Sequence, residues 1–238
     1  MEGKIEAKII AEAQDTKNLP EIISKLNIDV PPRGLGRNNS HSELYAVAHL
    51  IQNIQDEIFD FPLILAKREC PDFLLRLGDT EIGIEHAEAV ENEIAHAASI
   101  RNRKEIGPEV YHSLRSPIRR STARKAEELE KIIEADLAGP PWTGNEPEKQ
   151  WLIDIEGVIN EKQCKSHNYT RYFTNTLLIY DNLHLPNVNY TIAINELYNI
   201  IKHRKYFFDI IYIFDERFFC EINLNKKSAP SIRKLLKP

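Results

Sequence analysis

Residues 71–89, PDFLLRLGDTEIGIEHAEA, constrain the fold of this chain more than any other segment. Two short apolar runs meet at Gly78-Asp79, a composition typical of a β-hairpin with a tight turn. Asp72 opens the first run and Glu85 interrupts the second. Acidic residues are depleted in strands, and a carboxylate among apolar neighbours carries a large desolvation cost unless a cation pairs with it. The segment therefore predicts a hairpin that presents an acidic site.

Alternation along the second run places Glu85 on one face of the strand with Gly83 and Ala87, and His86 on the other face. The two small neighbours leave room for a ligand to approach the Glu85 carboxylate. The alternative is that Glu85 is an ordinary solvent-facing residue. His86 is expected to be a packed core histidine rather than a side-chain ligand. Glu88 continues the acidity near the end of the strand and is a secondary candidate.

Residues 40–59 predict an amphipathic helix, because their apolar side chains recur at helical spacing. Glu43 falls inside the apolar arc, about 20° from both Leu50 and Ile54 on a helix of 3.6 residues per turn. Two interpretations stay open. Ser40 and Glu43 fit the S-x-x-E pattern of a capping box, or the carboxylate faces the core and joins the acidic hairpin.

Residues 148–165 predict a second amphipathic helix. Lys162 lies near the middle of its apolar arc, about 20° from Ile155, whereas Lys165 lies at the edge. A lysine that faces the core needs an anionic partner. The alternative is that its stem lies along apolar surface while the ammonium reaches solvent near the helix C-terminus.

The remaining pattern predicts an α/β fold with one mixed sheet over a single domain, residues 1–238. Residues 1–36 are expected to be an N-terminal extension and residues 92–147 a basic helical insertion. The other expected elements are helices at 10–14, 19–28, 92–138 (with breaks) and 196–205, and strands at 61–65, 174–180, 188–194, 207–214 and 217–224.

Charge is unevenly distributed along a chain whose formal net charge is −5. Two basic stretches are either solvated faces or surfaces for a polyanion. They contain Arg101, Arg103, Lys104, Arg115, Arg119, Arg120, Arg124 and Lys125, and in the tail Lys226, Lys227, Arg233, Lys234 and Lys237. The chain shows no signal-peptide core, no run near the roughly 18 apolar residues of a membrane span and no paired-cysteine motif. We expect a cytoplasmic protein without a membrane segment.

Three features together resemble the PD-(D/E)xK nuclease superfamily: Glu43 on a core helix, Pro71-Asp72 at the start of a strand, and Glu85 on the next strand. The pattern of that superfamily continues with a lysine two positions after the second acidic residue. Ala87 stands at this position, so the chain resembles a divergent subgroup. The resemblance implies a restriction-endonuclease-like core, with a central mixed β-sheet flanked by helices.

The resemblance further implies a nuclease that hydrolyses phosphodiester bonds with Mg²⁺ or Mn²⁺, and DNA is the expected substrate. Asp72 and Glu85 would coordinate the metal, with Glu43 assisting and the carbonyl of His86 as a further ligand; hard divalent ions prefer such oxygen ligands. Lys162 is the candidate to replace the missing lysine.

The DNA backbone would be held by basic residues without reading of sequence. The candidates are Arg101, Arg103, Lys104, Arg115, Arg119, Arg120, Arg124 and Lys165. Concerted cleavage of two strands would need a homodimer. The alternative function is a catalytically inactive nuclease-fold module that binds nucleic acid or a protein partner.

Overall fold

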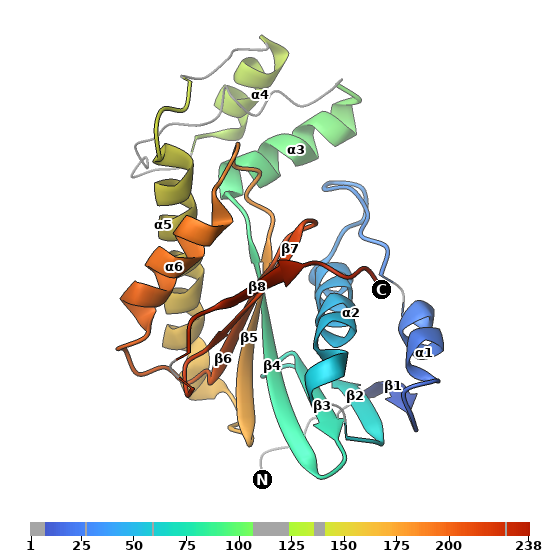
Figure 1. Ribbon diagram of the computed structural model, residues 1–238. Helices are drawn as coiled ribbons and strands as arrows, with labels where there is room; N and C mark the ends of the chain where they lie inside the picture. The colour runs from blue at the N-terminus through green and yellow to red at the C-terminus, as the bar shows by residue number, and fades with distance from the viewer. Residues whose placement is uncertain (1–7, 27, 59, 107–123, 136–140, 227) are drawn as a thin grey trace.

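The computed structural model describes residues 8–26, 28–58, 60–106, 124–135, 141–226 and 228–238. In these residues one eight-stranded sheet forms the centre of the molecule, and its strand order follows the order of the chain (Figure 1). The strands are β1 (Lys8–Ala13), β2 (Leu63–Lys67), β3 (Phe73–Leu77), β4 (Thr80–Ala89), β5 (Thr174–Asp181), β6 (Ile210–Phe214), β7 (Phe218–Asn223) and β8 (Ser231–Lys234).

The sheet is mixed. Strand β5 runs parallel to both of its neighbours, β4 and β6, and every other neighbouring pair is antiparallel. A parallel pair needs a long crossover, and helices supply both crossovers here. The predicted α/β class with a mixed sheet is confirmed.

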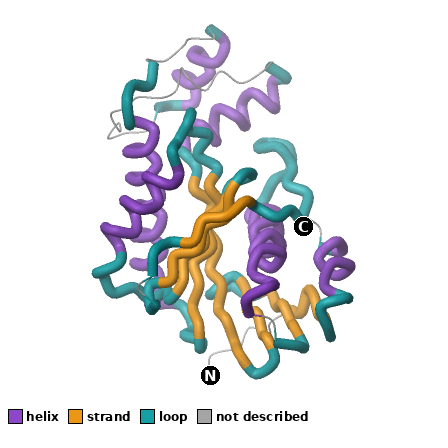
Figure 2. The backbone as a smooth tube through the Cα atoms, viewed as in Figure 1, coloured by secondary structure: helices purple, strands orange, loops and turns teal. Residues whose placement is uncertain are grey.

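Helices cover both faces of the sheet (Figures 1 and 2). One face carries α1 (Leu19–Lys25) and α2 (Asn39–Ile58), and the other carries α5 (Glu146–Lys165) and α6 (Tyr190–Ile201). Helices α3 (Asn92–Lys104) and α4 (Ala126–Glu134) pack on each other beyond one end of the sheet. None of the described helices has the length and apolar composition needed to cross a membrane.

Alternation along the strands divides the core into two layers. Phe73 and Ile84 pack with α2, whereas Ala87 and Ala89 pack with Trp151 of α5. The predicted hairpin of residues 71–89 is confirmed as β3 and β4, which pair from Phe73 with Ile84 to Leu77 with Thr80. Gly78 takes a positive φ of 55° in its turn, a conformation that favours glycine.

Two predictions of local structure are wrong. Residues 10–14, expected as a helix, lie largely in β1, because pairing with β2 and burial of Ala11 and Ala13 outweigh the helix propensity of this segment. Residues 188–194, expected as a strand, lead into α6, which begins at Tyr190. The side chain of Asn189 caps it by accepting from the Ile192 amide at 3.3 Å.

The two segments expected as additions to the fold are only partly separate from it. The predicted N-terminal extension supplies β1 to the sheet and α1 to the core. The predicted insertion forms α3 and α4, while residues 107–123 and 136–140 lie outside the described residues. Strand β2 begins at Leu63 rather than at residue 61, immediately after Pro62, which lacks an amide donor.

A buried contact fixes α5 to the sheet. The side chain of Trp151 is fully buried, and its indole Nε1 donates to Asp181 Oδ2 at 2.6 Å. The Leu183 amide donates to the other carboxylate oxygen at 3.2 Å. Since α5 also carries Lys162, this contact sets the position of that lysine.

We expect Trp151→Phe to lower the free energy of unfolding by about 2–4 kcal/mol, because it leaves a small cavity and removes a donor from a buried carboxylate. Urea denaturation measures this loss. Trp142→Phe is the matched control, since Trp142 is only half-buried, and should change stability by less than about 1 kcal/mol. Equal effects of the two substitutions would contradict the anchoring role of Trp151.

Candidate functional site

Asp72 and Glu85 lie side by side on neighbouring strands. Phe73 pairs with Ile84 in the antiparallel register of β3 and β4, so one further step along each strand sets Asp72 opposite Glu85. Because Phe73 and Ile84 face α2, the two carboxylates share the face that α5 covers. The amide of His86 donates to Asp72 Oδ2 at 2.8 Å and fixes its orientation.

The two carboxylates repel each other at a place where Glu85 is buried and Asp72 is half-buried. Like charges directly opposite one another destabilise a strand pair. Burial, followed by the negative charge of Glu85, raises the pKa of Asp72 from 3.8 to about 6. Binding of a cation between the two groups would remove this repulsion.

The oxygens of Glu85 have different surroundings. Lys162 Nζ donates to Oε1 at 2.6 Å, and the Tyr169 hydroxyl donates to the same oxygen at 2.9 Å. Burial and the Glu85 charge raise the pKa of Tyr169, so its hydroxyl stays protonated. Oε2 is buried and has no hydrogen-bond partner within the described residues. It is therefore the oxygen left for a further ligand.

Glu43 reaches the site through a lysine that the sequence did not single out. Lys67 at the end of β2 donates to Glu43 Oε2 at 2.5 Å, and the same ammonium lies 4.0 Å from Asp72 Oδ1. The helix that carries Glu43 begins at Asn39, and Asn38 Oδ1 accepts from the amide of His41 at 3.3 Å. The capping role therefore falls to Asn38, and the carboxylate of Glu43 faces the sheet.

The ring of His86 lies on the α2 side of β4, as the strand alternation predicts. His86 is only 7% exposed, and its Nε2 has no hydrogen-bond partner in the described part of the chain. Burial, with the positive charges of Lys162 and Lys67, lowers the pKa of His86 to about 3. The imidazole is therefore neutral at pH 7, and the ring lies on the opposite strand face from Glu85.

A cavity of about 310 Å³ opens between α2 and α5 at this point. Four of the predicted catalytic and metal-binding residues line it, together with the secondary candidate Glu88, and Glu85 is joined to its wall through Lys162. The lining residues are Asn39, Ser42, Glu43, Asp72, His86, Ala87, Glu88, Val158, Glu161 and Lys162. The cavity gives a ligand access to Asp72 and to the lysine.

Asp72 and Glu85 are the carboxylates that the β3–β4 register places opposite each other in this site. Among the described residues, no group of three or more His, Cys, Asp and Glu side chains is placed to hold a metal. Mg²⁺ is usually held by one or two carboxylates and completes its shell with waters and substrate phosphates. Asp72 and the unpartnered Oε2 of Glu85 fit that kind of open site and do not fit a closed protein cage.

The predicted nucleic-acid-binding residues that the structure describes mostly have partners within the chain. Lys104 bonds Glu134 at 3.1 Å across α3 and α4, and Lys165 bonds Glu161 at 2.6 Å along α5. Arg124 pairs with Glu93. Arg101 is buried, and the Arg103 side chain donates to the carbonyl of Ser99 at 3.3 Å. Arg115, Arg119 and Arg120 lie outside the described residues.

Sequence reasoning did not find Lys67 and Tyr169. A signal for Lys67 exists, because it follows the buried Leu63 and Leu65 at strand spacing and so points to the same side. Tyr169 gives no such signal, since the short 3₁₀-helix Ser166–Asn168 that follows α5 decides where its ring lies.

No family model matches this chain, and searches of curated proteins and of solved structures also give no match. The functional interpretation therefore depends on the arrangement of the side chains themselves.

We expect Asp72→Asn to stabilise the metal-free protein at pH 7 by about 2–3 kcal/mol, because asparagine still accepts from the His86 amide but carries no charge. The raised pKa of Asp72 costs stability above about pH 6, and this cost disappears as the pH falls towards the unfolded value of 3.8. Urea denaturation in EDTA at pH 7 and pH 5 measures the difference in the free energy of unfolding between the variant and the wild type. This difference should be smaller at pH 5. A variant less stable than the wild type at pH 7 would contradict this account.

Proposed function

We propose that this protein is a metal-dependent nuclease that hydrolyses phosphodiester bonds, with DNA as the expected substrate. The observation that supports this most directly is a pair of carboxylates, the half-buried Asp72 and the buried Glu85, which lie opposite each other and next to the ammonium of Lys162. Isolated buried carboxylates in this arrangement are costly, whereas a divalent cation makes them useful. The mixed sheet flanked by helices, with Glu43 on α2 ahead of the hairpin, supports a PD-(D/E)xK core.

Mg²⁺ or Mn²⁺ would be held by Asp72, by Oε2 of Glu85 and by the backbone carbonyl of His86. Such an ion polarises the phosphoryl group and lowers the pKa of a bound water. The chain keeps both carboxylates in place: the His86 amide holds Asp72, while Lys162 and Tyr169 hold Oε1 of Glu85. The other oxygen, Oε2, has no hydrogen-bond partner among the described residues and is the one left for the ion.

Lys162 takes the place of the missing strand lysine in this proposal. Ala87 faces α5 from the same side of β4 as Glu85, and α5 brings the Lys162 ammonium to that side. Packing of Ile155 and Ile159 in the core fixes the helix, while the lysine side chain stays 20% exposed and lines the cavity. Its ammonium can neutralise charge on the phosphate and orient the attacking water.

We expect the protein to cut plasmid DNA with Mg²⁺ or Mn²⁺ and to be inactive in EDTA. Asp72→Asn and Glu85→Gln should each lower the cleavage rate by roughly 100-fold or more, because each removes a ligand for the ion. Glu81→Gln is the matched control, since Glu81 lies on the same strand but pairs with Arg76 at the exposed end of the hairpin. Gel assays of initial rates measure these effects.

Cleavage that persists in Asp72→Asn and Glu85→Gln would overturn the proposal. Salt-sensitive DNA binding without metal-dependent cleavage by the wild type would instead favour the inactive binding module.

We expect Lys162→Ala to lower the rate constant of cleavage by roughly 100-fold, a typical effect for loss of a positioned catalytic group. Lys165→Ala, on the same helix but exposed and paired with Glu161, should leave the rate near that of the wild type. Single-turnover assays separate the rate constant from DNA binding. If Lys67→Ala abolishes cleavage while Lys162→Ala does not, the assignment of the lysine is wrong and passes to Lys67.

A further inference from the structure

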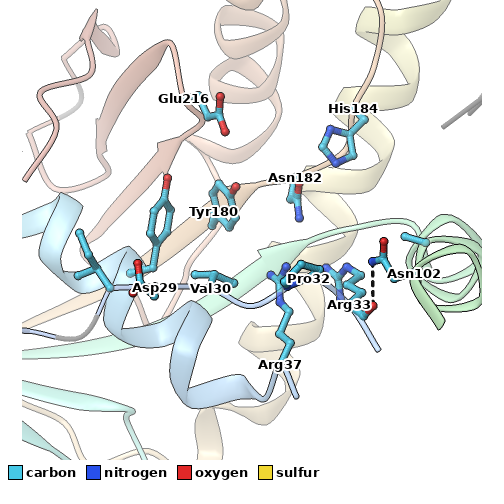
Figure 3. A pocket seen from close by; sticks show the side chains of 13 residues that line it. Asp29, Val30, Pro32, Arg33, Arg37, Asn102, Tyr180, Asn182, His184 and Glu216 are labelled. Carbon is cyan, nitrogen blue, oxygen red and sulfur yellow. Dashed lines mark hydrogen bonds between the residues drawn. The ribbon is translucent and has the colours of Figure 1, made fainter. Parts of the chain in front are cut away.

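A larger cavity of about 480 Å³ lies on the α2 face of the sheet, at the carboxyl ends of the parallel strands (Figure 3). Tyr180 lies near the carboxyl end of β5. Asn182 and His184 follow that strand, and Glu216 follows β6. Tyr45 enters from α2. Ligands of open α/β sheets bind outside the carboxyl ends of the strands, so the position is suited to a ligand.

A smaller hollow lies between this cavity and the candidate metal site. The hollow, of about 230 Å³, shares Arg33 and Arg37 with the larger cavity. The hollow also shares Ser42 and Glu88 with the cavity that contains Asp72. The three spaces therefore adjoin one another, and together they are called the groove below. Glu85 and Glu88 are three residues apart on β4, about 10 Å along the strand, and their side chains lie on opposite faces of it.

Two arginines stand at the junction of the groove. Arg33 and Arg37 both bond the Glu88 carboxylate, and the distance from Arg37 to each carboxylate oxygen is 2.8 Å. The Asn182 side chain donates to Glu88 at 2.6 Å, and the Asn102 side chain holds the backbone carbonyl of Arg33 at 2.9 Å (Figure 3).

Two guanidinium groups face a single carboxylate at this junction, so the arginine–Glu88 cluster carries a net positive charge. A guanidinium has five N–H donors, and bonds to Glu88 use only some of them. The cluster is therefore a preformed partner for one phosphate.

Away from the arginines, the cavity is lined by the phenols of Tyr45 and Tyr180 and also by the carboxylates of Asp29 and Glu216. The ring centroids of Tyr45 and Tyr180 lie 5.3 Å apart. The Tyr180 ring also stacks on Phe214, with 5.2 Å between the centroids, and this contact fixes the orientation of Tyr180. Neither phenol makes a hydrogen bond to another described residue. Burial raises the pKa of both, so the hydroxyls stay protonated. A phenol both donates and accepts, which suits the polar edge of a nucleobase.

Charge in the cavity is distributed unevenly. Figure 3 shows Glu216 on one side of the Tyr180 ring and Arg37 on the other. A phosphate is attracted to the arginine side and repelled from Glu216, whose carboxylate can accept from base N–H or sugar hydroxyl groups. This order, phosphate at one end and hydrogen-bonding groups at the other, matches a nucleotide.

We propose that the groove holds a single nucleic-acid strand and that the cavity takes one unpaired nucleotide of it, with its phosphate on Arg33 and Arg37 and its base edge on Tyr45 and Tyr180. The inference rests on the proposed nuclease function and specifies its substrate. A base that is paired inside a duplex does not reach such a cavity, and enzymes that act on bases take them out of the stack. The preferred substrate is therefore single-stranded or locally unpaired.

We expect nucleoside monophosphates to bind the protein in EDTA, measured by isothermal titration calorimetry. Tyr45→Phe combined with Tyr180→Phe should weaken this binding by roughly tenfold, because two hydrogen bonds are lost while both rings keep their packing. Tyr198→Phe is the control, since Tyr198 lies on α6 against the other sheet face. Binding that the double substitution leaves unchanged, or that inorganic phosphate alone reproduces, would overturn the inference.

A second arm distinguishes a substrate strand from a free nucleotide. In the Asp72→Asn background and in EDTA, a single-stranded oligonucleotide should bind at least roughly tenfold tighter than the blunt duplex of the same sequence, and the tyrosine double substitution should weaken it. Equal binding of duplex and single strand would contradict the inference. If the double substitution weakens binding of monophosphates but not binding of the oligonucleotide, the cavity is a site for free nucleotides instead.

These binding measurements require no cleavage, so they separate the two proposals. Binding of unpaired nucleotides by a protein that does not cleave would retain the cavity and reject the nuclease. Cleavage of DNA by a protein whose cavity binds no nucleotide would retain the nuclease and reject the nucleotide-binding cavity.

Discussion

The repulsion between Asp72 and Glu85 is the interaction on which the rest of the site depends. The register of β3 and β4 sets the half-buried Asp72 opposite the buried Glu85. Each carboxylate then needs a cation or a hydrogen-bond donor nearby, and segments on both faces of the sheet supply these groups. Helix α5 brings Lys162, the segment after it brings Tyr169, and β2 brings Lys67. The site is thus built from both faces of the sheet, although its acidic centre lies within one hairpin.

The parts of this site that could be predicted from sequence are those with a short-range signal. The hairpin follows from two apolar runs around Gly78, and the inward position of Lys162 follows from helical spacing within α5. The mixed sheet follows from the alternation of strands and helices. Glu43 was left between two interpretations, because helical geometry gives the direction of a side chain but not its partner.

The wrong predictions come from contacts between distant parts of the chain. Residues 10–14 carry helix-forming residues and nevertheless pair with β2, more than fifty positions later in the printed sequence. The helix α6 starts within a run rich in β-branched residues, since burial of Ala193 and Leu197 on one side favours the helical spacing. Tyr169 was missed for the same reason: its contact with Glu85 spans 84 positions.

Counting charges along the chain does not show which cations have carboxylate partners in the folded protein. Basic residues outnumber acidic ones between Arg101 and Lys125, yet Arg124 pairs with a carboxylate of α3 and Lys104 with one of α4. Arg33 and Arg37 belong to no basic run, and the loop that carries them sets both beside the groove. Arg33 and Arg37 also have a carboxylate partner, but the two arginines share the single carboxylate of Glu88.

The long crossover between β4 and β5 also affects the order in which the parts of the site come together during folding. The hairpin that joins Asp72 to Glu85 closes over a short stretch of chain, whereas Glu85 meets its neighbour Leu177 only after α3, α4 and α5 have been placed. Closing a longer loop costs more entropy and is slower. During synthesis the acidic hairpin therefore emerges before its lysine and its tyrosine. The carboxylate pair exists for a time without either donor, and the lysine completes a site whose negative charge is already in place.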